Sequence, residues 1–380
     1  METIIIIVAV VVCVTYSCII ISFLIGIKNL KGEVFSKNQL PEIKFSIIIP
    51  FRNEAVNLPE LLLGLIGLDY NRNLYELIFI DDESEDQSVA LIENYLSKEE
   101  DINYSILKNT RKSNSPKKDA IASAITKANF EWILTTDADC YVPATWLKSF
   151  NSIILKANPV MVIGPVTYKL EKGFINAFET LDFLSLTGST MGGCGIGKPF
   201  LCNGANLAYQ KKVFLEVNGF SGNDSIAGGD DIFMLEKLQN KFPEKIVFLK
   251  QQEAIVVTKP AGSFKKLWSQ RLRWASKTAA YANRFALLIG LTVFAMNTFL
   301  ILLFVFYVFN VVEFTILSAM YLVKFNLDFL LLFQAAKFYQ QEHVLKAYFF
   351  SSIIYPVFNF LIALRSFFGG YDWKGRHFKK

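Results

Sequence analysis

The sequence predicts an α/β domain with a mainly parallel sheet, flanked by transmembrane helices. The composition is the first reason: 52% of the 380 residues are hydrophobic, 35 are phenylalanine, and the net charge is +5. Such a chain is too apolar for an ordinary soluble domain. The second reason is that long uncharged runs occur near both ends, and the third is that strand and helix patterns alternate between them.

The N-terminal run, residues 4–27, contains no charged residue before Lys28. It is long enough to cross a hydrocarbon layer of about 30 Å. Because no basic segment precedes it and no clear cleavage site follows, we interpret it as a retained anchor rather than a signal peptide. A buried core helix is the alternative. We therefore expect a transmembrane helix over residues 1–27 and a linker over residues 28–44.

Three further apolar runs predict about three membrane segments within residues 285–368. The runs are residues 285–309, 311–333 and 345–368. The middle run contains Glu313, Lys324 and Asp328. Lys324 and Asp328 are four residues apart, so on a helix they share a face and can neutralise each other.

The distribution of basic residues predicts the orientation in the membrane. No Lys or Arg precedes the first run, whereas lysines follow it at positions 28, 31, 37 and 44. The positive-inside rule then places the N-terminus outside and the central domain in the cytoplasm. Three full C-terminal spans would put the basic tail, residues 369–380, outside. Either one segment does not cross fully, with 311–333 the first candidate, or the tail breaks the rule.

The central domain, residues 45–260, alternates strand and helix patterns. The expected strands are 45–50, 77–82 and 102–108, the expected helices are 57–68, 88–96 and 117–128, and a further strand leads into "TTDADC". This spacing predicts a parallel sheet with helices on its faces. The glycines of "GGCGIG", residues 192–197, follow no strand, so we expect a flexible loop there rather than a dinucleotide-binding turn.

Four carboxylates end two of the expected strands. Asp81 and Asp82 end one, and Asp137 and Asp139 end another. Ligands bind beyond the carboxyl ends of parallel strands, where unpaired carboxylates would raise each other's pKa. A divalent cation such as Mg²⁺ or Mn²⁺ would relieve the repulsion, because both ions prefer hard oxygen ligands. The alternative is that each pair merely starts a loop or caps a helix.

Histidine and zinc chemistry are not expected in the central domain. His343 and His377 both lie outside it. The cysteines show neither zinc-like nor disulfide-framework spacing; they are Cys13, Cys18, Cys140, Cys194 and Cys202. Acid–base chemistry there must therefore use carboxylates, lysines, cysteines or tyrosines.

A series of short motifs runs in order through residues 45–274. The motifs are "SIIIPFRNE", "IDDESEDQS", "KKDAIASAI", "TTDADC", "CNGANLAYQKKVF", "GGDD" and "QRLRW". Taken together between apolar runs, they resemble the nucleotide-sugar-binding domain of the family 2 glycosyltransferases. This family includes cellulose, chitin and hyaluronan synthases and the ceramide glucosyltransferases. The resemblance implies a GT-A-like fold for the central domain.

The resemblance implies a donor site at the strand ends. It assigns contacts with the nucleotide sugar to Pro50, Arg52, Glu54, Asp81, Asp82, Lys117 and Asp137. Asp139, the second aspartate of the D-x-D motif, matches the ligand of a divalent cation, Mg²⁺ or Mn²⁺, that bridges the diphosphate. The two charges of "TTDADC" would then hold the cation and, through it, the leaving group.

The resemblance also implies the catalytic groups. Asp231 matches the base that takes a proton from the acceptor hydroxyl, with Asp230 beside it. A carboxylate base agrees with the position of the two histidines outside the domain. The alternative for Asp230 is a cap on the helix that follows. The acceptor end of the pocket would be shaped by Asn203, Gly204 and Asn206.

The "QRLRW" segment predicts an amphipathic helix within residues 261–284. Gln270, Arg273 and Trp274 share one helical face. The resemblance assigns Arg273 to the diphosphate and Gln270 and Trp274 to the acceptor side. The neighbouring cations are expected to face anionic lipid; they are Lys265, Lys266, Arg271 and Lys277. The alternative is a helix that serves only as a basic membrane anchor.

The resemblance implies an inverting, metal-dependent membrane glycosyltransferase that moves a sugar from a nucleotide sugar, expected to be a UDP-sugar, to a lipid or glycan acceptor. The expected partners are donor, acceptor and membrane lipids, with no nucleic acid. The expected location is the bacterial inner membrane, with the catalytic domain in the cytoplasm and a role in the cell envelope. The alternatives are a processive polysaccharide synthase, a nucleotidyltransferase, and a transporter with a cytoplasmic domain.

Overall fold

The computed structural model describes residues 2–32, 40–223, 226, 228–278, 280, 282–368, 371–373 and 376–378. Much of the expected linker, Lys37 included, and half of the basic tail lie outside the described residues. The chain divides into two compact units. Unit 1 comprises residues 1–29, 170–198 and 260–380, and unit 2 comprises residues 30–169 and 199–259.

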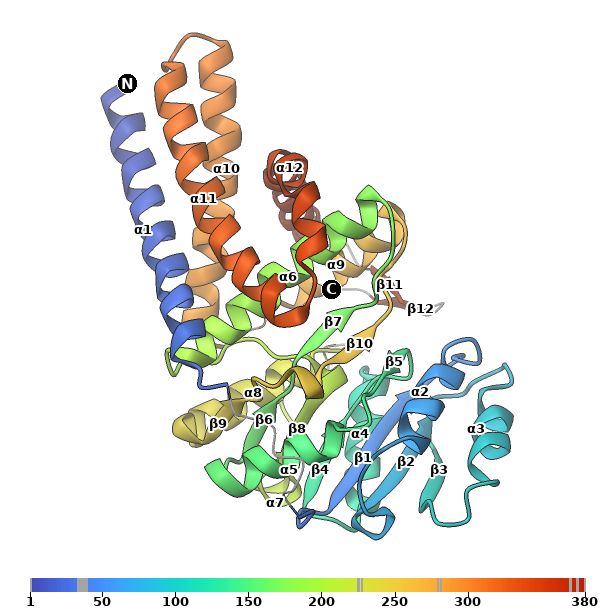
Figure 1. Cartoon of the computed structure of the whole chain (residues 1–380). Helices are drawn as coiled ribbons and strands as arrows, with labels where there is room; N and C mark the ends of the chain where they lie inside the picture. The colour runs from blue at the N-terminus through green and yellow to red at the C-terminus, as the bar shows by residue number, and fades with distance from the viewer. Residues whose placement is uncertain are drawn as a thin grey trace. The chain divides into compact units, whose positions relative to one another are not determined.

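Unit 2 is built on a seven-stranded sheet with the order β3-β2-β1-β4-β8-β6-β9 (Figure 1). The strands β3, β2, β1 and β4 are parallel and so are β6 and β9, whereas β8 is antiparallel to both of its neighbours. This confirms the predicted mainly parallel sheet. The bounds are β1 (Phe45–Phe51), β2 (Tyr75–Asp81), β3 (Tyr104–Lys108), β4 (Trp132–Thr135), β6 (Met161–Ile163), β8 (Leu207–Gln210) and β9 (Ile246–Phe248).

The central strands read as continuous apolar runs because both of their faces are covered. In β1, the side chains of Phe45, Ile47, Ile48 and Ile49 are fully buried. The helices of this unit are α2 (Leu58–Ile66), α3 (Ser88–Leu96), α4 (Pro116–Lys127), α5 (Trp146–Ala157), α7 (Lys211–Glu216) and α8 (Asp230–Lys241). The short helical turns are η1 (Arg72–Leu74), η2 (Gly204–Asn206), η3 (Pro243–Lys245) and η4 (Gln252–Ala254).

A second, three-stranded sheet supports the D-x-D segment. Its order is β5-β10-β7, with bounds β5 (Cys140–Tyr141), β10 (Val256–Thr258) and β7 (Val166–Tyr168). β5 pairs antiparallel with β10 and begins directly after Asp139. The two D-x-D carboxylates are therefore held between β4 of the large sheet and β5 of the small one.

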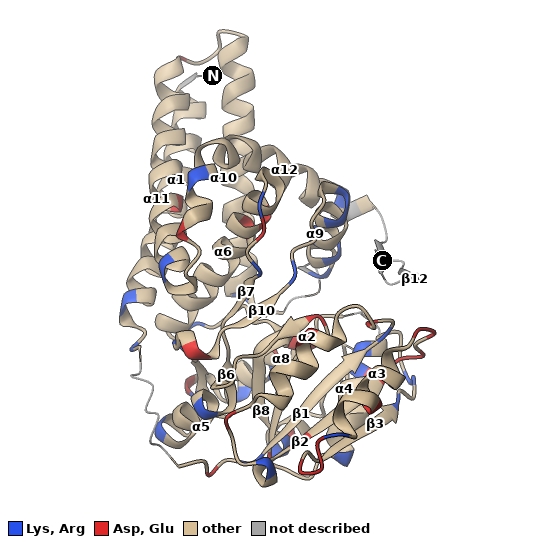
Figure 2. Cartoon of the chain, turned by 45° about the vertical axis from the view of Figure 1, so that its right-hand side comes forward, with Lys and Arg blue, Asp and Glu red and all other residues tan. Residues whose placement is uncertain are grey.

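Unit 1 contains the apolar helices. Its elements are α1 (Glu2–Asn29), α6 (Phe174–Gly195), α9 (Phe264–Thr278), α10 (Arg284–Val308), α11 (Phe314–Tyr339), η5 (Glu342–Ala347), α12 (Tyr348–Phe368), β11 (Tyr371–Trp373) and β12 (Arg376–Phe378). Four segments of the described chain are long and apolar enough to cross a membrane: Thr3–Asn29, Arg284–Val308, Phe314–Tyr339 and Glu342–Ser366. Figure 2, which colours the ribbon by residue type, shows few charged residues along α1, α10 and α11. The predicted flanking apolar helices are confirmed.

The prediction of a flexible loop at residues 192–197 is wrong, because most of this segment belongs to α6. Its glycines allow α6 and α1 to approach closely. A Cβ atom on Gly195 would lie 1.9 Å from the carbonyl oxygen of Gly26, and one on Gly192 would lie 2.4 Å from Cβ of Phe23. Small residues commonly permit such close packing between apolar helices. By its contacts, the segment 170–198 belongs to unit 1.

A polar cluster lies among the apolar helices of unit 1. Lys324 and Asp328 form the expected ion pair within α11. Tyr16 of α1 donates a hydrogen bond to the Asp328 carboxylate. The Lys324 ammonium also lies 5.5 Å from the ring centres of both Tyr16 and Tyr355 of α12. The cluster therefore connects three helices through one paired charge.

Replacing Lys324 with leucine should destabilise unit 1, because it leaves the Asp328 carboxylate without its cation. Removing one partner of a buried pair typically costs about 3–5 kcal/mol. The matched control is the double variant Lys324→Leu/Asp328→Leu, which should recover most of the loss. The measurement is thermal unfolding of the full chain in detergent. Equal destabilisation by the single and double variants would contradict the pairing.

Candidate active site

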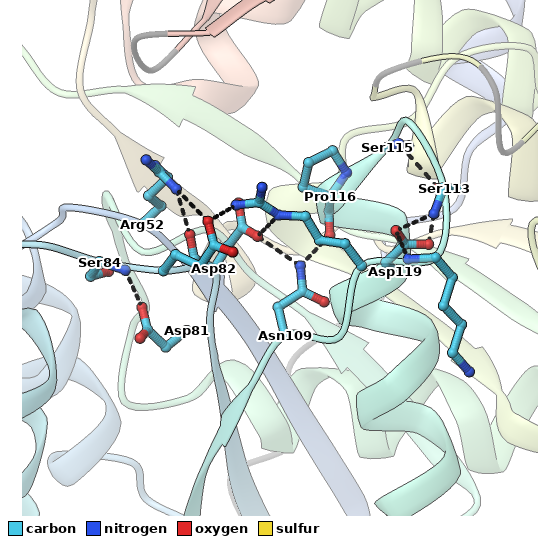
Figure 3. Close-up of polar contacts among 12 residues, drawn as sticks. Arg52, Asp81, Asp82, Ser84, Asn109, Ser113, Ser115, Pro116 and Asp119 are labelled. Carbon is cyan, nitrogen blue, oxygen red and sulfur yellow. Dashed lines mark hydrogen bonds and ion pairs between the residues drawn. The ribbon is translucent and has the colours of Figure 1, made fainter.

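The ends of β1 and β2 carry the first group of predicted residues. Arg52, just after β1, donates a 2.9 Å hydrogen bond from Nη1 to the backbone oxygen of Asp82, just after β2 (Figure 3). Its guanidinium also lies 3.5 Å from carboxylate oxygens of Glu83 and Glu85. The parallel pairing of β1 with β2 sets Phe51 opposite Asp81 and so brings the two strand ends together. Arg52 thus connects the two loops that follow these strands.

The carboxylates at the end of β2 are already bonded within the protein. Asp82 accepts hydrogen bonds at Oδ1 from Asn109 Nδ2 at 2.8 Å and from Arg111 Nε at 3.1 Å. Asp81 accepts one at Oδ1 from the backbone N–H of Ser84 at 2.9 Å. Figure 3 shows Arg52, Asp82 and Asn109 converging on one place. The geometry makes Asp82 the centre of a charged network at this edge of the sheet.

Pro50 and Glu54 flank Arg52 in the sequence. Pro50 is the sixth residue of β1 and is only partly buried. Glu54 is buried; its Oε2 accepts a 2.6 Å hydrogen bond from Asn57, and its backbone N–H donates to Ser88 Oγ at 2.8 Å. Glu54 therefore ties the loop after β1 to the first turns of α2 and α3.

The loop between β3 and α4 is held by side chains at the start of α4. Asp119 accepts hydrogen bonds from the backbone N–H groups of Lys112 and Ser113, both at 2.8 Å (Figure 3). Pro116 occupies the first turn of α4, where its missing N–H costs nothing. Ser115 Oγ accepts a 3.1 Å bond from the N–H of Gly228, which lies just before α8. The start of α4 is thereby connected to the segment that leads to Asp230.

Lys117 joins two of the acidic motifs. Its ammonium lies 2.7 Å from Asp137 Oδ1 of the D-x-D segment and 3.4 Å from Asp230 Oδ2 of "GGDD". Burial alone would lower the pKa of Lys117, but the charges of Asp137, Asp230 and Asp231 outweigh it and raise the pKa above its ordinary value. Lys117 therefore remains a cation at neutral pH and offsets the repulsion among these aspartates.

Asp230 and Asp231 open α8 beside a glycine of the "CNGAN" segment. Gly229, with a φ of 71°, is the residue that precedes the helix, and no side-chain cap bond forms there. The alternative interpretation of Asp230 as a helix cap is therefore wrong. Asp231 accepts a 3.1 Å bond at Oδ2 from the N–H of Gly204 and a 2.8 Å bond at Oδ1 from the N–H of Ile232. These two bonds fix the orientation of the partly exposed Asp231 carboxylate.

Two asparagines of the "CNGAN" segment hold the turn that contains Gly204. Asn206 is fully buried; its Nδ2 donates to Pro165 O and Ala254 O, and its Oδ1 accepts from Trp146 Nε1 at 2.9 Å. Asn203 accepts a 3.0 Å bond from the N–H of Ala205. The structure therefore gives Asn206 an internal position, from which it anchors the turn that presents Gly204.

The D-x-D segment ends β4 and begins β5. Asp137 and Asp139 are both partly exposed, and the Cys140 thiol lies 3.6 Å from Asp139 Oδ1. Burial, followed by the charges of Asp139 and Asp137, raises the pKa of Cys140 well above its ordinary value. Because the thiolate is the reactive form, Cys140 is unsuited to act as a nucleophile at neutral pH.

The D-x-D carboxylates fit a divalent cation whose remaining ligands would come from the phosphates of a bound substrate. Among the described residues, no group of three or more His, Cys, Asp or Glu side chains could hold a metal ion by itself. Asp137 is engaged by Lys117, and Asp139 lies two residues further along the same strand end. Mg²⁺ is commonly bound by one or two carboxylates together with substrate phosphates, and this donor set matches that pattern.

A methyl group at Gly204 should disturb this cluster. A Cβ there would lie 3.0 Å from Asp230 Oδ2, 3.5 Å from Lys117 Nζ and 3.7 Å from Asp231 Cβ. The Gly204→Ala variant is therefore expected to lower turnover roughly tenfold, since displacements of less than 1 Å already misalign reacting groups. The matched control is Gly290→Ala in α10, where a Cβ meets nothing within 4 Å. Equal activity of the two variants would contradict the close approach.

Unit 1 contains the "QRLRW" segment within α9. Gln270, Arg273 and Trp274 are all partly buried, and Trp274 packs against Phe183 of α6 with ring centres 6.4 Å apart. The expectation that Arg271 and Lys277 face lipid is wrong, because only 6% and 7% of these residues are exposed. Arg271 lies four residues after the fully buried Leu267, on the face of α9 that packs inside the unit. Lys265 and Lys266 are exposed as expected.

Several residues of the site were not predicted from the sequence. Asn109 and Arg111 bond to Asp82, and they belong to a polar loop that has no distinguishing pattern. Lys118 is 1% exposed, and its ammonium donates to the backbone oxygens of Asn223 at 2.5 Å and Ile226 at 3.0 Å. In the sequence Lys118 has no feature that distinguishes it from a solvated lysine, so its buried contacts are known only from the structure.

Two family models match the chain. The model described as glycosyl transferase family 2 matches residues 46–216, and the model described as glycosyl transferase family group 2 matches residues 132–335. The second match covers more than half of the chain, and both include the D-x-D segment and the "CNGAN" turn.

Individual proteins show more distant similarity. A dolichyl-phosphate beta-glucosyltransferase of Dictyostelium discoideum is 32% identical over 126 residues, which cover 32% of this chain and 37% of that protein. A poly-beta-1,6-N-acetyl-D-glucosamine synthase of Staphylococcus epidermidis is 23% identical over 261 residues, 67% of this chain and 59% of that protein. The chain thus matches less than two thirds of the length of either relative.

A solved structure supports the fold class. The mannosyltransferase PcManGT from Pyrobaculum calidifontis, determined in complex with GDP-Man and Mn²⁺, has a TM-score of 0.59 to this chain and 16% identity. The comparison covers 92% of this chain and 99% of that one. The predicted GT-A-like fold is thereby confirmed. The chain belongs to family 2 of the glycosyl transferases.

Proposed function

We propose that this protein transfers a sugar from a nucleoside diphosphate sugar, a UDP-sugar in the first instance, to a lipid or glycan acceptor. The observation that carries the proposal is the cluster around Lys117. The Lys117 ammonium contacts Asp137 and Asp230, and the nearby Asp231 carboxylate accepts a hydrogen bond from the N–H of Gly204. Family membership supplies the reaction class. The names of the relatives, a dolichyl-phosphate glucosyltransferase and a polysaccharide synthase, support lipid and glycan acceptors respectively.

The proposed mechanism assigns one task to each group of residues. The network of Arg52 and Asp82 would hold the nucleoside, with Glu54 keeping the loop after β1 in place. Lys117 would contribute positive charge beside the diphosphate. Asp231 would accept the proton of the attacking acceptor oxygen, which is a hydroxyl of a glycan or the P–OH of a lipid phosphate monoanion, as that oxygen attacks the anomeric carbon, so that one displacement inverts the anomeric centre. The sugar–phosphate bond breaks, and the nucleoside diphosphate leaves.

The proposal includes a divalent cation, Mg²⁺ or Mn²⁺, at the D-x-D carboxylates. Asp139 would hold it, with Asp137 nearby. When bound, such a cation supplies positive charge that stabilises the departing diphosphate. The solved mannosyltransferase with a similar fold contains Mn²⁺, which supports this part of the proposal.

A transfer assay tests the function. The purified full chain in detergent is given radiolabelled UDP-glucose, UDP-N-acetylglucosamine or GDP-mannose with dolichyl phosphate or a bacterial lipid extract, and label is measured in the organic phase. We expect transfer from one donor, of one sugar per acceptor. Long water-soluble polymer would instead favour the processive synthase. Release of pyrophosphate without transfer would contradict the proposal and favour a nucleotidyltransferase.

We also propose that α1, α10 and α11 cross the membrane and that α12 lies along its surface with α9. In Figure 1, α1, α10 and α11 run alongside one another, whereas α12 points in another direction and is seen nearly end-on. α12 packs against α9 through Phe358, whose ring centre lies 6.0 Å from those of Phe264 and Trp268. The opposite face of α12 is apolar and exposed; it includes Phe350, Ile353, Val357, Leu361 and Leu364.

This topology would resolve the conflict over the basic tail. With three spans and an N-terminus outside, unit 2 and the tail share the cytoplasmic side, as the positive-inside rule requires. The segment 311–333, the first candidate for an incomplete span, would then cross as part of α11. A C-terminal green fluorescent protein fusion should be fluorescent, and a C-terminal alkaline phosphatase fusion should be inactive. The reverse result would mean that α12 crosses as well.

A further inference from the structure

Arg271 is a buried arginine whose ion pair connects two helices of unit 1. Arg271 of α9 and Asp182 of α6 are each 6% exposed, and the Nε of Arg271 donates to the Asp182 carboxylate. A guanidinium taken out of water is costly unless it is paired and hydrogen-bonded. A basic residue kept only for attraction to anionic lipid would remain at the surface, as Lys265 and Lys266 do. Arg271 must therefore act inside the protein.

Arg271 also contacts two residues of the "QRLRW" motif. Its Nη1 donates a 2.5 Å hydrogen bond to Gln270 Oε1. The guanidinium carbon lies 4.2 Å from the centre of the Trp274 ring, within the range of a cation–π contact. Phe183, the neighbour of Asp182 on α6, packs against the same indole ring. One arginine thus touches the amide and the indole that share a face of α9.

A second carboxylate of α6 holds the segment that leads into α9. Glu179 is fully buried, one helical turn before Asp182, and its Oε1 accepts a 2.8 Å hydrogen bond from the N–H of Ala261. Burial raises the pKa of Glu179, and the bond from Ala261 and the charge of Arg271 offset part of that rise. The two carboxylates of α6 therefore hold two parts of the chain. Glu179 holds the segment before α9, and Asp182 holds the "QRLRW" motif within α9.

We infer that Asp182 and Arg271 are a positioning pair, which sets the orientation of the Gln270 amide and the Trp274 indole for a sugar or headgroup of the acceptor. The inference rests on the proposed function for its substrate, because Gln270 and Trp274 are assigned there to the acceptor side. The planar guanidinium suits this task, since it can pair with Asp182, donate to Gln270 and stack on Trp274 at the same time. A lysine at position 271 could keep the charge but not all three contacts.

A double variant separates positioning from simple stability. The Asp182→Asn change leaves a buried guanidinium without its counter-ion and should destabilise the protein. The double variant Asp182→Leu/Arg271→Met removes both charges, and such neutral replacements of buried pairs are often as stable as the original. If the pair only stabilises the contact between α6 and α9, the stable double variant should match the wild type in Trp274 fluorescence and in KM. If it positions the motif, the double variant should be folded but altered at Trp274.

The deciding readout is the fluorescence of Trp274, which needs no ligand. The Trp274 signal is obtained by subtracting spectra of the same protein carrying Trp274→Phe, and its accessibility is measured by acrylamide quenching. We expect the double variant to show a red-shifted, more strongly quenched Trp274, with the other tryptophans unchanged. Lys265→Gln, on the exposed side of the same helix, is the control and should leave Trp274 unaltered. An unchanged Trp274 signal in the folded double variant would overturn the inference.

A functional readout with UDP-glucose and dolichyl phosphate extends the test. The double variant should raise the KM for dolichyl phosphate by about 10- to 100-fold, the range that corresponds to losing a hydrogen bond from a charged group. The KM of the double variant for UDP-glucose should stay unchanged. The single variant Arg271→Lys, which keeps the charge, should raise the KM for dolichyl phosphate less than the double variant does. An equal change in both KM values would overturn a role specific to the acceptor. Absence of transfer by the wild type would refute the proposed function for these substrates, while the fluorescence result would still decide whether the pair positions Trp274.

Discussion

Replacing Asp231 with asparagine is expected to lower turnover by about 10²- to 10⁴-fold, the usual contribution of a positioned base. Asparagine keeps the shape of the side chain and can still accept the bond from Gly204 N–H, but it cannot take a proton. Donor binding should survive, because the proposed donor contacts lie on other residues. The measurement is kcat for transfer together with the affinity for UDP-glucose from titration.

The matched control for this change is Asp101→Asn, an exposed carboxylate of the same unit. It removes one negative charge without touching the cluster and should leave kcat unaltered. The role assigned to Asp231 would be wrong if Asp231→Asn abolished binding of UDP-glucose while bound donor still reacted at the normal rate.

Replacing Asp139 with asparagine is expected to reduce transfer by about 10²- to 10³-fold, as loss of a metal contribution of several kcal/mol implies. Asp139 is the D-x-D carboxylate that matches the metal ligand of the family, whereas Asp137 pairs with the Lys117 ammonium at 2.7 Å. A chelator should have the same effect on the wild type. Transfer is measured before and after chelation and after Mn²⁺ or Mg²⁺ is returned.

Recovery of transfer on adding metal distinguishes the chelated wild type from the Asp139→Asn variant. The chelated wild type should regain activity with either ion, whereas Asp139→Asn should not. Circular dichroism of both proteins should stay unchanged, since Asp139 lies at the surface of the strand end. Full activity of the wild type in chelator would contradict a metal-dependent mechanism.

Much of the fold could be predicted from the sequence, because its signals are local. Short apolar runs that contain isoleucine marked β1 and β2, and the expected helix 88–96 coincides with α3. Several elements beyond β5 had no predicted counterpart, among them α5, β6, β7, β9 and β10. The predicted loop at residues 192–197 is instead largely the end of α6, whose glycines resemble a loop. Its glycines are explained by a neighbour distant in sequence, α1, and local pattern carries no information about such a contact.

The sequence predicted many of the residues of the site but not which of them contact one another. The sequence shows that Lys117, Asp137, Asp230 and Gly204 are motif residues, but only the fold shows that they meet in one cluster. Arg271 was misplaced because charge alone suggested a lipid-facing residue. Its spacing of four from Leu267 was the available signal that it shares the inward face of α9.

If the cluster around Lys117 and Asp231 transfers a sugar with inversion, the reaction must release a nucleoside diphosphate and form the opposite anomer. Both products can be followed by nuclear magnetic resonance of one reaction mixture, with ³¹P spectra for the nucleotide and ¹H spectra for the anomeric proton. With the α-linked donor that the transfer assay identifies, we expect one nucleoside diphosphate for each β-linked sugar transferred, and neither product from Asp231→Asn above about 1% of the wild-type rate. Appearance of pyrophosphate, or of an α-linked product, would contradict this mechanism.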